Sequence, residues 1–70
     1  MLEYEFYNGE YFITFDLIAI SENYQIATIA VSCAGKISVQ EFDLYEDENG
    51  LYFEYGPLFH IIRIDNLEIR

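Results

Sequence analysis

The residues that could do chemistry gather in one stretch, Asp43–Gly56, where acidic side chains surround an Asn-Gly pair. An EF-hand calcium loop has a glycine at its sixth position and needs carboxylates at the first and the twelfth. If Gly50 is that glycine, the first position is Tyr45 and the twelfth is Gly56. Both required carboxylates are missing, so the stretch predicts a β-hairpin instead of a calcium site.

The other reactive residue types stand alone. Cys33 is the only cysteine, and a lone thiol in an apolar run favours a small buried hydrophobe over a redox thiol. His60 is the only histidine, which is typical of a packed or edge residue, because a catalytic or metal role needs partners. The serines and glycines form no nucleophile motif and no phosphate-binding loop. We therefore expect no enzyme, no cofactor and no metal.

The charge balance is strongly acidic. The chain has thirteen Asp and Glu residues but only three basic residues, Lys36, Arg63 and Arg70, which gives a net charge of -10. Such a charge repels nucleic acid phosphates and anionic membranes, so direct binding to either is not expected. It favours a partner with a basic surface; the alternative is that the charge serves only solubility.

The sequence predicts no export signal and no membrane-spanning segment. Residues 1–5 offer no basic region followed by a long apolar run, so no signal peptide is expected. No apolar stretch approaches the roughly 20 residues of a transmembrane helix. The single cysteine agrees with a reducing compartment, and we expect a cytoplasmic protein.

Alternating apolar and polar residues predict one small β domain over residues 1–70. Leu2–Tyr7 and Glu10–Ile20 flank Asn8-Gly9, which suits a two-residue type I′ turn. This turn pairs Phe6 with Tyr11. The inward face is then Leu2, Tyr4, Phe6, Tyr11, Ile13 and Phe15.

The next strand, Ala27–Cys33, is apolar on both faces and is expected at the centre of the sheet. A three-residue loop, Ser21–Asn23, sets Leu17 opposite Ala27. Treating Ala34–Lys36 as the following turn directs Ile37 and Val39 inward. Phe42 and Leu44 then fall out of phase, which predicts a β-bulge near Gln40-Glu41.

Asp43–Gly56 forms the third hairpin. A four-residue loop, Asp47–Gly50, pairs Leu44 with Phe53, Tyr45 with Tyr52 and Asp43 with Glu54, and it places Gly50 in the left-handed region. Leu58–Asp65 reads as the last strand, and Leu67–Ile69 as a cap on the core. The predicted fold is all-β: a six-stranded antiparallel meander that closes as a small barrel or rolled sheet, SH3-like in size.

The outer face of this fold is not uniformly polar. Ten apolar or aromatic residues fall there: Tyr7, Phe12, Ile18, Ile20, Tyr24, Ile26, Tyr45, Tyr52, Phe59 and Ile61. Exposed patches of this kind mark protein interfaces, where tyrosine is favoured. The predicted interface residues are Ile18, Ile20, Tyr24, Ile26, Tyr45 and Tyr52. The alternative is that the sheet curls or the tail covers this face, so that these residues form a second small core.

Lys36–Gly56, G-K-I-S-V-Q-E-F-D-L-Y-E-D-E-N-G-L-Y-F-E-Y-G with its leading glycine, resembles small uncharacterised acidic proteins of bacterial mobile elements. The resemblance implies a bacterial protein and transfers no activity or site residue.

Two functions follow from the residues. The first is a non-enzymatic protein-interaction module, which binds a protein partner or itself as a homodimer. The second is an acidic mimic of nucleic acid that inhibits a DNA-binding protein. It rests on Glu3/Glu5, Glu41/Asp43 and Glu46/Glu48, pairs at period two that lie roughly 6.5–7 Å apart along a strand.

Overall fold

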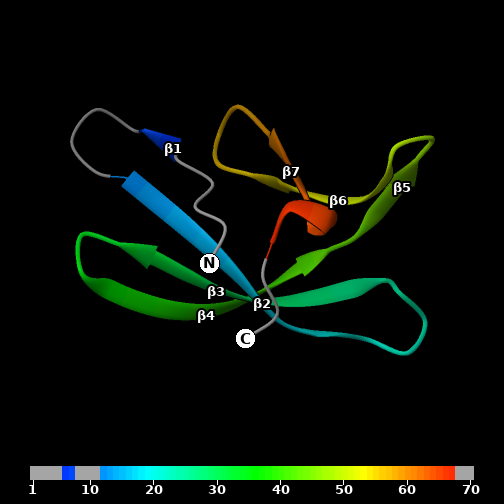
Figure 1. Cartoon of the computed structure of the whole chain (residues 1–70), viewed down its shortest axis with the longest axis horizontal. Helices are drawn as coiled ribbons and strands as arrows, with labels where there is room; N and C mark the ends of the chain where they lie inside the picture. Colours follow the sequence, from blue (N-terminus) through cyan, green and yellow to red (C-terminus); the bar gives the residue numbers. More distant parts are fainter. Residues whose placement is uncertain (1–5, 8–11, 68–70) are drawn as a thin grey trace.

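The chain folds as β-strands in two antiparallel sheets, as a computed structural model shows (Figure 1). The structure describes residues 6–7 and 12–67. The first sheet has the order β1-β2-β3-β4, with β1 at Phe6–Tyr7, β2 at Phe12–Ile20, β3 at Ile26–Cys33 and β4 at Lys36–Asp43. The second has the order β5-β6-β7, with β5 at Tyr45–Asp47, β6 at Gly50–Tyr55 and β7 at His60–Arg63. A 3-10 turn, η1, follows at Ile64–Asn66.

The all-β prediction is confirmed, but the closed barrel is wrong. The described residues form seven strands in two sheets instead of six strands in one. The division falls at Leu44, the single residue between β4 and β5. Its backbone N–H donates to the carbonyl of Gln25, 2.8 Å away, just outside β3. This bond is the last rung of the ladder with β3, in the same register as Ile26 and Asp43, and the same ribbon continues as the edge of the second sheet (Figure 1).

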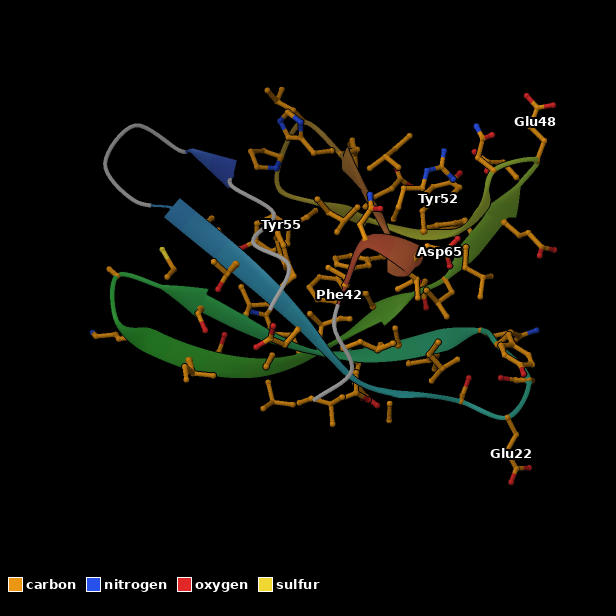
Figure 2. All side chains as sticks on the ribbon, in the orientation of Figure 1. Glu22, Phe42, Glu48, Tyr52, Tyr55 and Asp65 are labelled. Carbon is orange, nitrogen blue, oxygen red and sulfur yellow. The ribbon has the colours of Figure 1, made fainter. Side chains whose placement is uncertain are left out.

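The core lies between the two sheets. It is built by the residues Ile13, Phe15, Leu17, Ala27, Ile29, Val31, Phe53, Ile62, Ile64 and Leu67. Phe53 of the second sheet meets Phe15 edge-on at 5.7 Å between ring centroids and stacks on Phe42 at 4.6 Å. Figure 2 shows Phe42 and Tyr55 directed into the space between the sheets. Aromatic contacts of this geometry add to the stabilisation from burial, so these rings hold the two layers together.

The first hairpin differs in register from the prediction. Phe6 pairs with Ile13 and Tyr7 with Phe12, whereas a two-residue Asn8-Gly9 loop would pair Phe6 with Tyr11. A shift of two residues leaves the period-two alternation in phase, so hydrophobic alternation alone does not detect it. The predicted positions of Leu2, Tyr4 and Tyr11 lie outside the described residues.

The β2–β3 pairing is also shifted by two residues. Leu17 pairs with Ile29 instead of Ala27, and a bulge places Ile18 as an extra residue before Ala19. The bulge reverses the alternation beyond it, so Ile20 pairs with Ala27 and packs against the core. The prediction that Ile20 faces outward is therefore wrong.

The β3–β4 turn explains two further corrections. Cys33 pairs with Lys36, so only Ala34 and Gly35 form the turn, and both have the positive φ that a type I′ turn requires (54° and 77°). Counting Lys36 in the turn displaced the predicted register by one residue, which exchanges the two faces of a strand.

The correct register turns Ile37 and Val39 outward, where they are 59% and 64% exposed. Phe42 lies inward opposite Ala27 without any bulge, because the ladder from Lys36 to Asp43 is regular. The predicted bulge near Gln40-Glu41 was needed only to repair the wrong register.

Ala34→Gly is expected to stabilise the protein by about 1 kcal/mol, because a left-handed backbone costs an alanine roughly 1–2 kcal/mol and costs glycine little. Urea unfolding should show a higher midpoint with an unchanged slope. Ala19→Gly, at an exposed strand position without positive φ, is the control and should destabilise. Equal effects of the two substitutions would contradict the strain at Ala34.

The third hairpin confirms the predicted register. Tyr45 pairs with Tyr52, Glu46 with Leu51 and Asp47 with Gly50, and Gly50 has a φ of 109°. The Asp43/Glu54 pair does not form, because Asp43 belongs to the first sheet and pairs with Ile26.

The last strand is shorter than Leu58–Asp65. β7 covers only His60–Arg63, Leu58 is 76% exposed before it, and η1 carries Ile64 into the core. Leu67 is buried as the predicted cap; Ile69 lies outside the described residues.

Candidate functional site

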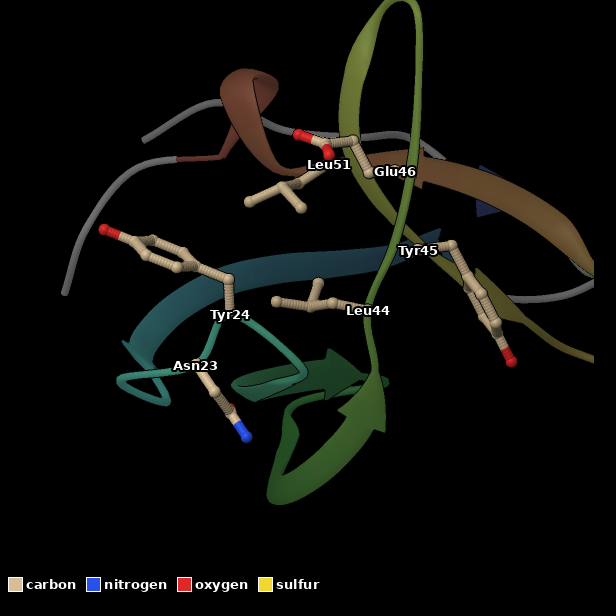
Figure 3. Close-up of a pocket in the computed structure, with 6 residues that line it drawn as sticks. All are labelled: Asn23, Tyr24, Leu44, Tyr45, Glu46 and Leu51. Carbon is tan, nitrogen blue, oxygen red and sulfur yellow. The ribbon is translucent and has the colours of Figure 1, made fainter.

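A hollow of ≈ 390 Å³ lies between the β2–β3 loop and the β5–β6 hairpin. Its lining residues are Asn23, Tyr24, Leu44, Tyr45, Glu46 and Leu51. Figure 3 shows Tyr24, Leu44 and Leu51 directed to one side, while the ring of Tyr45 lies on the other side of its strand. We call this region the loop hollow. It offers two aliphatic side chains and a tyrosine ring to whatever enters it.

The loop presents Tyr24 at some cost to the backbone. Tyr24 has a φ of 58°, a conformation that bulky residues rarely adopt, and the residue is 63% exposed. The hydroxyl of Ser21 fixes the loop by accepting the backbone N–H groups of Gln25 at 3.1 Å and Ile26 at 3.0 Å. A strained residue that is held firmly and left exposed is a feature of binding surfaces.

A second hollow, of ≈ 270 Å³, lies on the other side of the β4–β5 ribbon. Its lining residues are Glu41, Phe42, Asp43, Tyr45, Glu54 and Phe59. We call it the acidic hollow. Tyr45 lines both hollows, so the loop hollow with its two leucines and the acidic hollow adjoin across one aromatic side chain.

A stack of side chains covers the outer face of the second sheet. The Tyr45 and Tyr52 rings lie 5.6 Å apart, and the Arg63 guanidinium lies 5.0 Å from the Tyr52 ring centroid. Arg63 also donates two hydrogen bonds to the Asp47 carboxylate, at 2.7 and 2.8 Å. Asp47 in turn accepts the backbone N–H of Asn49 at 2.9 Å, which ties the hairpin turn to β7. This stack gives the exposed Tyr45 a rigid support.

The pKa of Asp47 is lowered, chiefly by the hydrogen bond from Arg63. A folded pKa below the unfolded one gives stability that is present above the unfolded pKa and is lost as pH falls through the folded pKa. Asp47→Asn should therefore lower stability at pH 7, and the difference from the parent should shrink below about pH 4, near the ordinary aspartate pKa. Urea unfolding of the parent and of Asp47→Asn, from pH 7 to below pH 4, measures this difference in stability.

Glu48→Gln is the control for that series. It removes a neighbouring carboxylate from the turn without touching the Asp47–Arg63 ion pair. If the stability difference for Asp47→Asn were independent of pH, the ion pair would not be the source of its effect.

Of the six predicted interface residues, Tyr24 and Tyr45 line the same hollow, and the rings of Tyr45 and Tyr52 lie 5.6 Å apart. Tyr24 lies on the loop, and Tyr45 and Tyr52 lie on the second sheet. Ile26 is 40% exposed on β3, Ile18 is the bulge residue at 37%, and Ile20 packs against the core. Leu44 and Leu51, which line the loop hollow, were not predicted, because sequence alternation assigned both to the core. Only the position at which the strand passes from the first sheet to the second, at Leu44, shows that these two leucines line a hollow.

The remaining reactive residues gather in neither hollow. Cys33 is half-buried against the core and His60 is exposed beside Tyr55. Asp16 is buried on β2, opposite Ala30. Over residues 6–7 and 12–67, no group of three or more His, Cys, Asp or Glu side chains is arranged to hold a metal ion. Within the same residues, no helix has the length and apolar character needed to span a bilayer.

The chain matches no protein-family model, no curated protein and no solved structure.

Proposed function

We propose that this protein is a non-enzymatic protein-interaction module whose binding surface is centred on Tyr24 and Tyr45. The observation that carries the proposal is the strained, exposed Tyr24 beside a hollow lined by Leu44 and Leu51. Interfaces draw their binding energy from a few buried aromatic anchors, and tyrosine is among the residues enriched there.

The charges around this surface indicate the kind of partner. Glu22 and Glu48 project from the tips of the two loops at the same end of the molecule (Figure 2). Glu46 lines the loop hollow, and the acidic hollow lies across Tyr45. The complementary partner is a basic protein segment with an apolar or aromatic anchor, since opposite potentials guide association and select the partner.

A random peptide display library tests the proposal. Panning against the parent chain, with counter-selection on a Tyr24→Gly/Tyr45→Ser variant, should enrich peptides that combine Lys or Arg with a large apolar residue. Peptides that bind parent and variant equally, or that lack basic residues, would overturn it. Circular dichroism of the variant confirms that it is folded.

Self-association is the second form of the same proposal. Size-exclusion chromatography with light scattering, at low and moderate salt, separates the two forms. A dimer that persists with salt and dissociates on Tyr24→Gly/Tyr45→Ser substitution means that the surface binds a second copy. A monomer leaves it free for another protein.

An acidic mimic of nucleic acid is the other candidate function. Glu41 and Asp43 lie on one face of the exposed strand β4, which favours it. The Glu46/Glu48 row does not continue as predicted, because Glu48 lies in the turn beyond β5. A mimic should displace DNA from a basic DNA-binding protein with an affinity that falls steeply with salt; a flat salt response excludes it.

A further inference from the structure

β4 is a long strand at the open edge of the first sheet. Among the described residues it pairs only with β3, and its burial pattern is exposed throughout except at Phe42. Over residues 6–7 and 12–67, the other edge strands, β1, β5 and β7, have two, three and four residues, against eight in β4. In an antiparallel pair alternate residues bond to the same neighbour, so every second residue of β4 turns its N–H and C=O toward the open edge. Edges of this length recruit further strands unless they are blocked.

The apolar and acidic side chains of β4 lie at opposite ends of the strand, so the edge can distinguish the two orientations of a partner strand. Every second residue of β4 lies on the same face, as the pairing with β3 requires: Ile37, Val39, Glu41 and Asp43. Two apolar residues therefore precede two acidic residues at a spacing of two. Ile37 and Val39 are 59% and 64% exposed, so both remain available to an added strand.

We propose that β4 is a second binding site, which accepts an extended basic peptide as an added antiparallel strand. Residues directly opposite each other in such a pair lie on one face and interact most strongly as apolar or opposite-charge pairs. Because the added strand is antiparallel, the N-terminal part of the partner lies opposite the C-terminal part of β4. Its first residues are therefore basic and face Asp43 and Glu41, and its later residues are apolar and face Val39 and Ile37. The partner segment has the pattern basic-x-basic-x-apolar-x-apolar.

The net charge selects this occupant over a second copy of the chain. Each copy carries a net charge of -10, so pairing two β4 strands brings like charges together, which disfavours association. A basic strand reduces that charge and also satisfies the backbone groups of the edge. The two sites share Glu41 and Asp43 of the acidic hollow, but β4 contributes neither Tyr24 nor the aliphatic lining of the loop hollow, so substitution of Tyr24 distinguishes them.

The test uses the peptide Lys-Thr-Lys-Thr-Val-Thr-Val and the full chain, with affinity measured by fluorescence anisotropy. Val39→Lys should weaken binding at least tenfold, because it sets a charge against the apolar part of the peptide. Ser38→Lys, one residue away on the opposite face of β4, is the matched control and should change affinity less than threefold. Tyr24→Gly should leave it unchanged, which separates this site from the proposed function.

A charge exchange makes the result independent of folding. A Glu41→Lys/Asp43→Lys variant should lose the basic peptide and gain Glu-Thr-Glu-Thr-Val-Thr-Val, which the parent chain does not bind. Backbone pairing is tested by N-methylating alternate peptide residues: one of the two patterns should abolish binding and the other retain it, because only alternate amides face β4.

Three outcomes would overturn the proposal. The first is equal binding of a peptide of the same composition in which the basic and apolar residues no longer share a face. The second is equal tolerance of both N-methylation patterns. The third is a dimer whose β4 amides already resist hydrogen exchange without peptide, which would mean that the edge is filled by a second copy.

Discussion

Phe53→Ala should remove a large part of the free energy of unfolding. Phe53 is fully buried, and its ring contacts Phe15 of β2 and Phe42 of β4. Truncating a buried phenylalanine costs about 3–5 kcal/mol. A chain of 70 residues has a total stability of roughly 3.5–10 kcal/mol, so one substitution removes a large part of it.

Phe59→Ala is the matched control, because Phe59 lies at the turn before β7 and is 68% exposed. Both phenylalanine and alanine must adopt the same positive φ there, 52° in the parent, so backbone strain cancels. Its effect should stay within about 0.5 kcal/mol. Urea unfolding followed by circular dichroism measures both variants. A loss of less than about 1 kcal/mol for Phe53→Ala would mean that the two sheets do not depend on this contact.

Tyr24→Gly should make the protein more stable and a poorer binder at the same time. Glycine adopts the left-handed conformation of Tyr24 without the roughly 1–2 kcal/mol cost, less about 0.5–1 kcal/mol of added chain entropy. The exposed ring contributes little packing, so a net gain of about 0.5–1 kcal/mol is expected. Truncating a tyrosine anchor costs about 2 kcal/mol of binding, which is a roughly thirtyfold loss of affinity for the peptides obtained by display.

Tyr24→Phe is the control for the binding half of this prediction. It keeps the ring and the strained backbone, so both stability and affinity should stay close to the parent values. Urea unfolding and fluorescence anisotropy on the same samples give the two readings. A Tyr24→Gly variant that loses stability would show that the ring packs on the protein itself, and one that binds normally would show that another residue is the anchor.

The sequence predicted which strands form more reliably than how they pair. The register of the third hairpin was predicted correctly because the four-residue loop Asp47–Gly50 separates apolar from polar side chains and leaves a glycine at the position of positive φ. At Ala34-Gly35 the same chemistry was present, but alanine is not a residue that indicates positive φ, so Lys36 was assigned to the turn. That one residue exchanged the faces of β4, hid the exposure of Ile37 and Val39, and suggested a bulge that does not exist.

The candidate site was harder to predict than the fold. Hydrophobic alternation identifies the residues that leave water but does not show which sheet buries them, so Leu44 and Leu51 looked like ordinary core positions. The loop hollow lies where β4 leaves the ladder with β3, just after Leu44, whose N–H makes the last rung with Gln25. The point at which a ladder ends leaves no trace in residue types.

The order of strands also bears on how the chain folds. Every ladder described joins strands that follow one another in the sequence, so each pairing closes a short loop and loses little chain entropy. The contacts that join the two sheets span more of the chain: Phe15 of β2 meets Phe53 and Tyr55 of β6, which follow it by 38 and 40 residues. We therefore expect the hairpins to form early and the docking of the two sheets to limit the rate of folding.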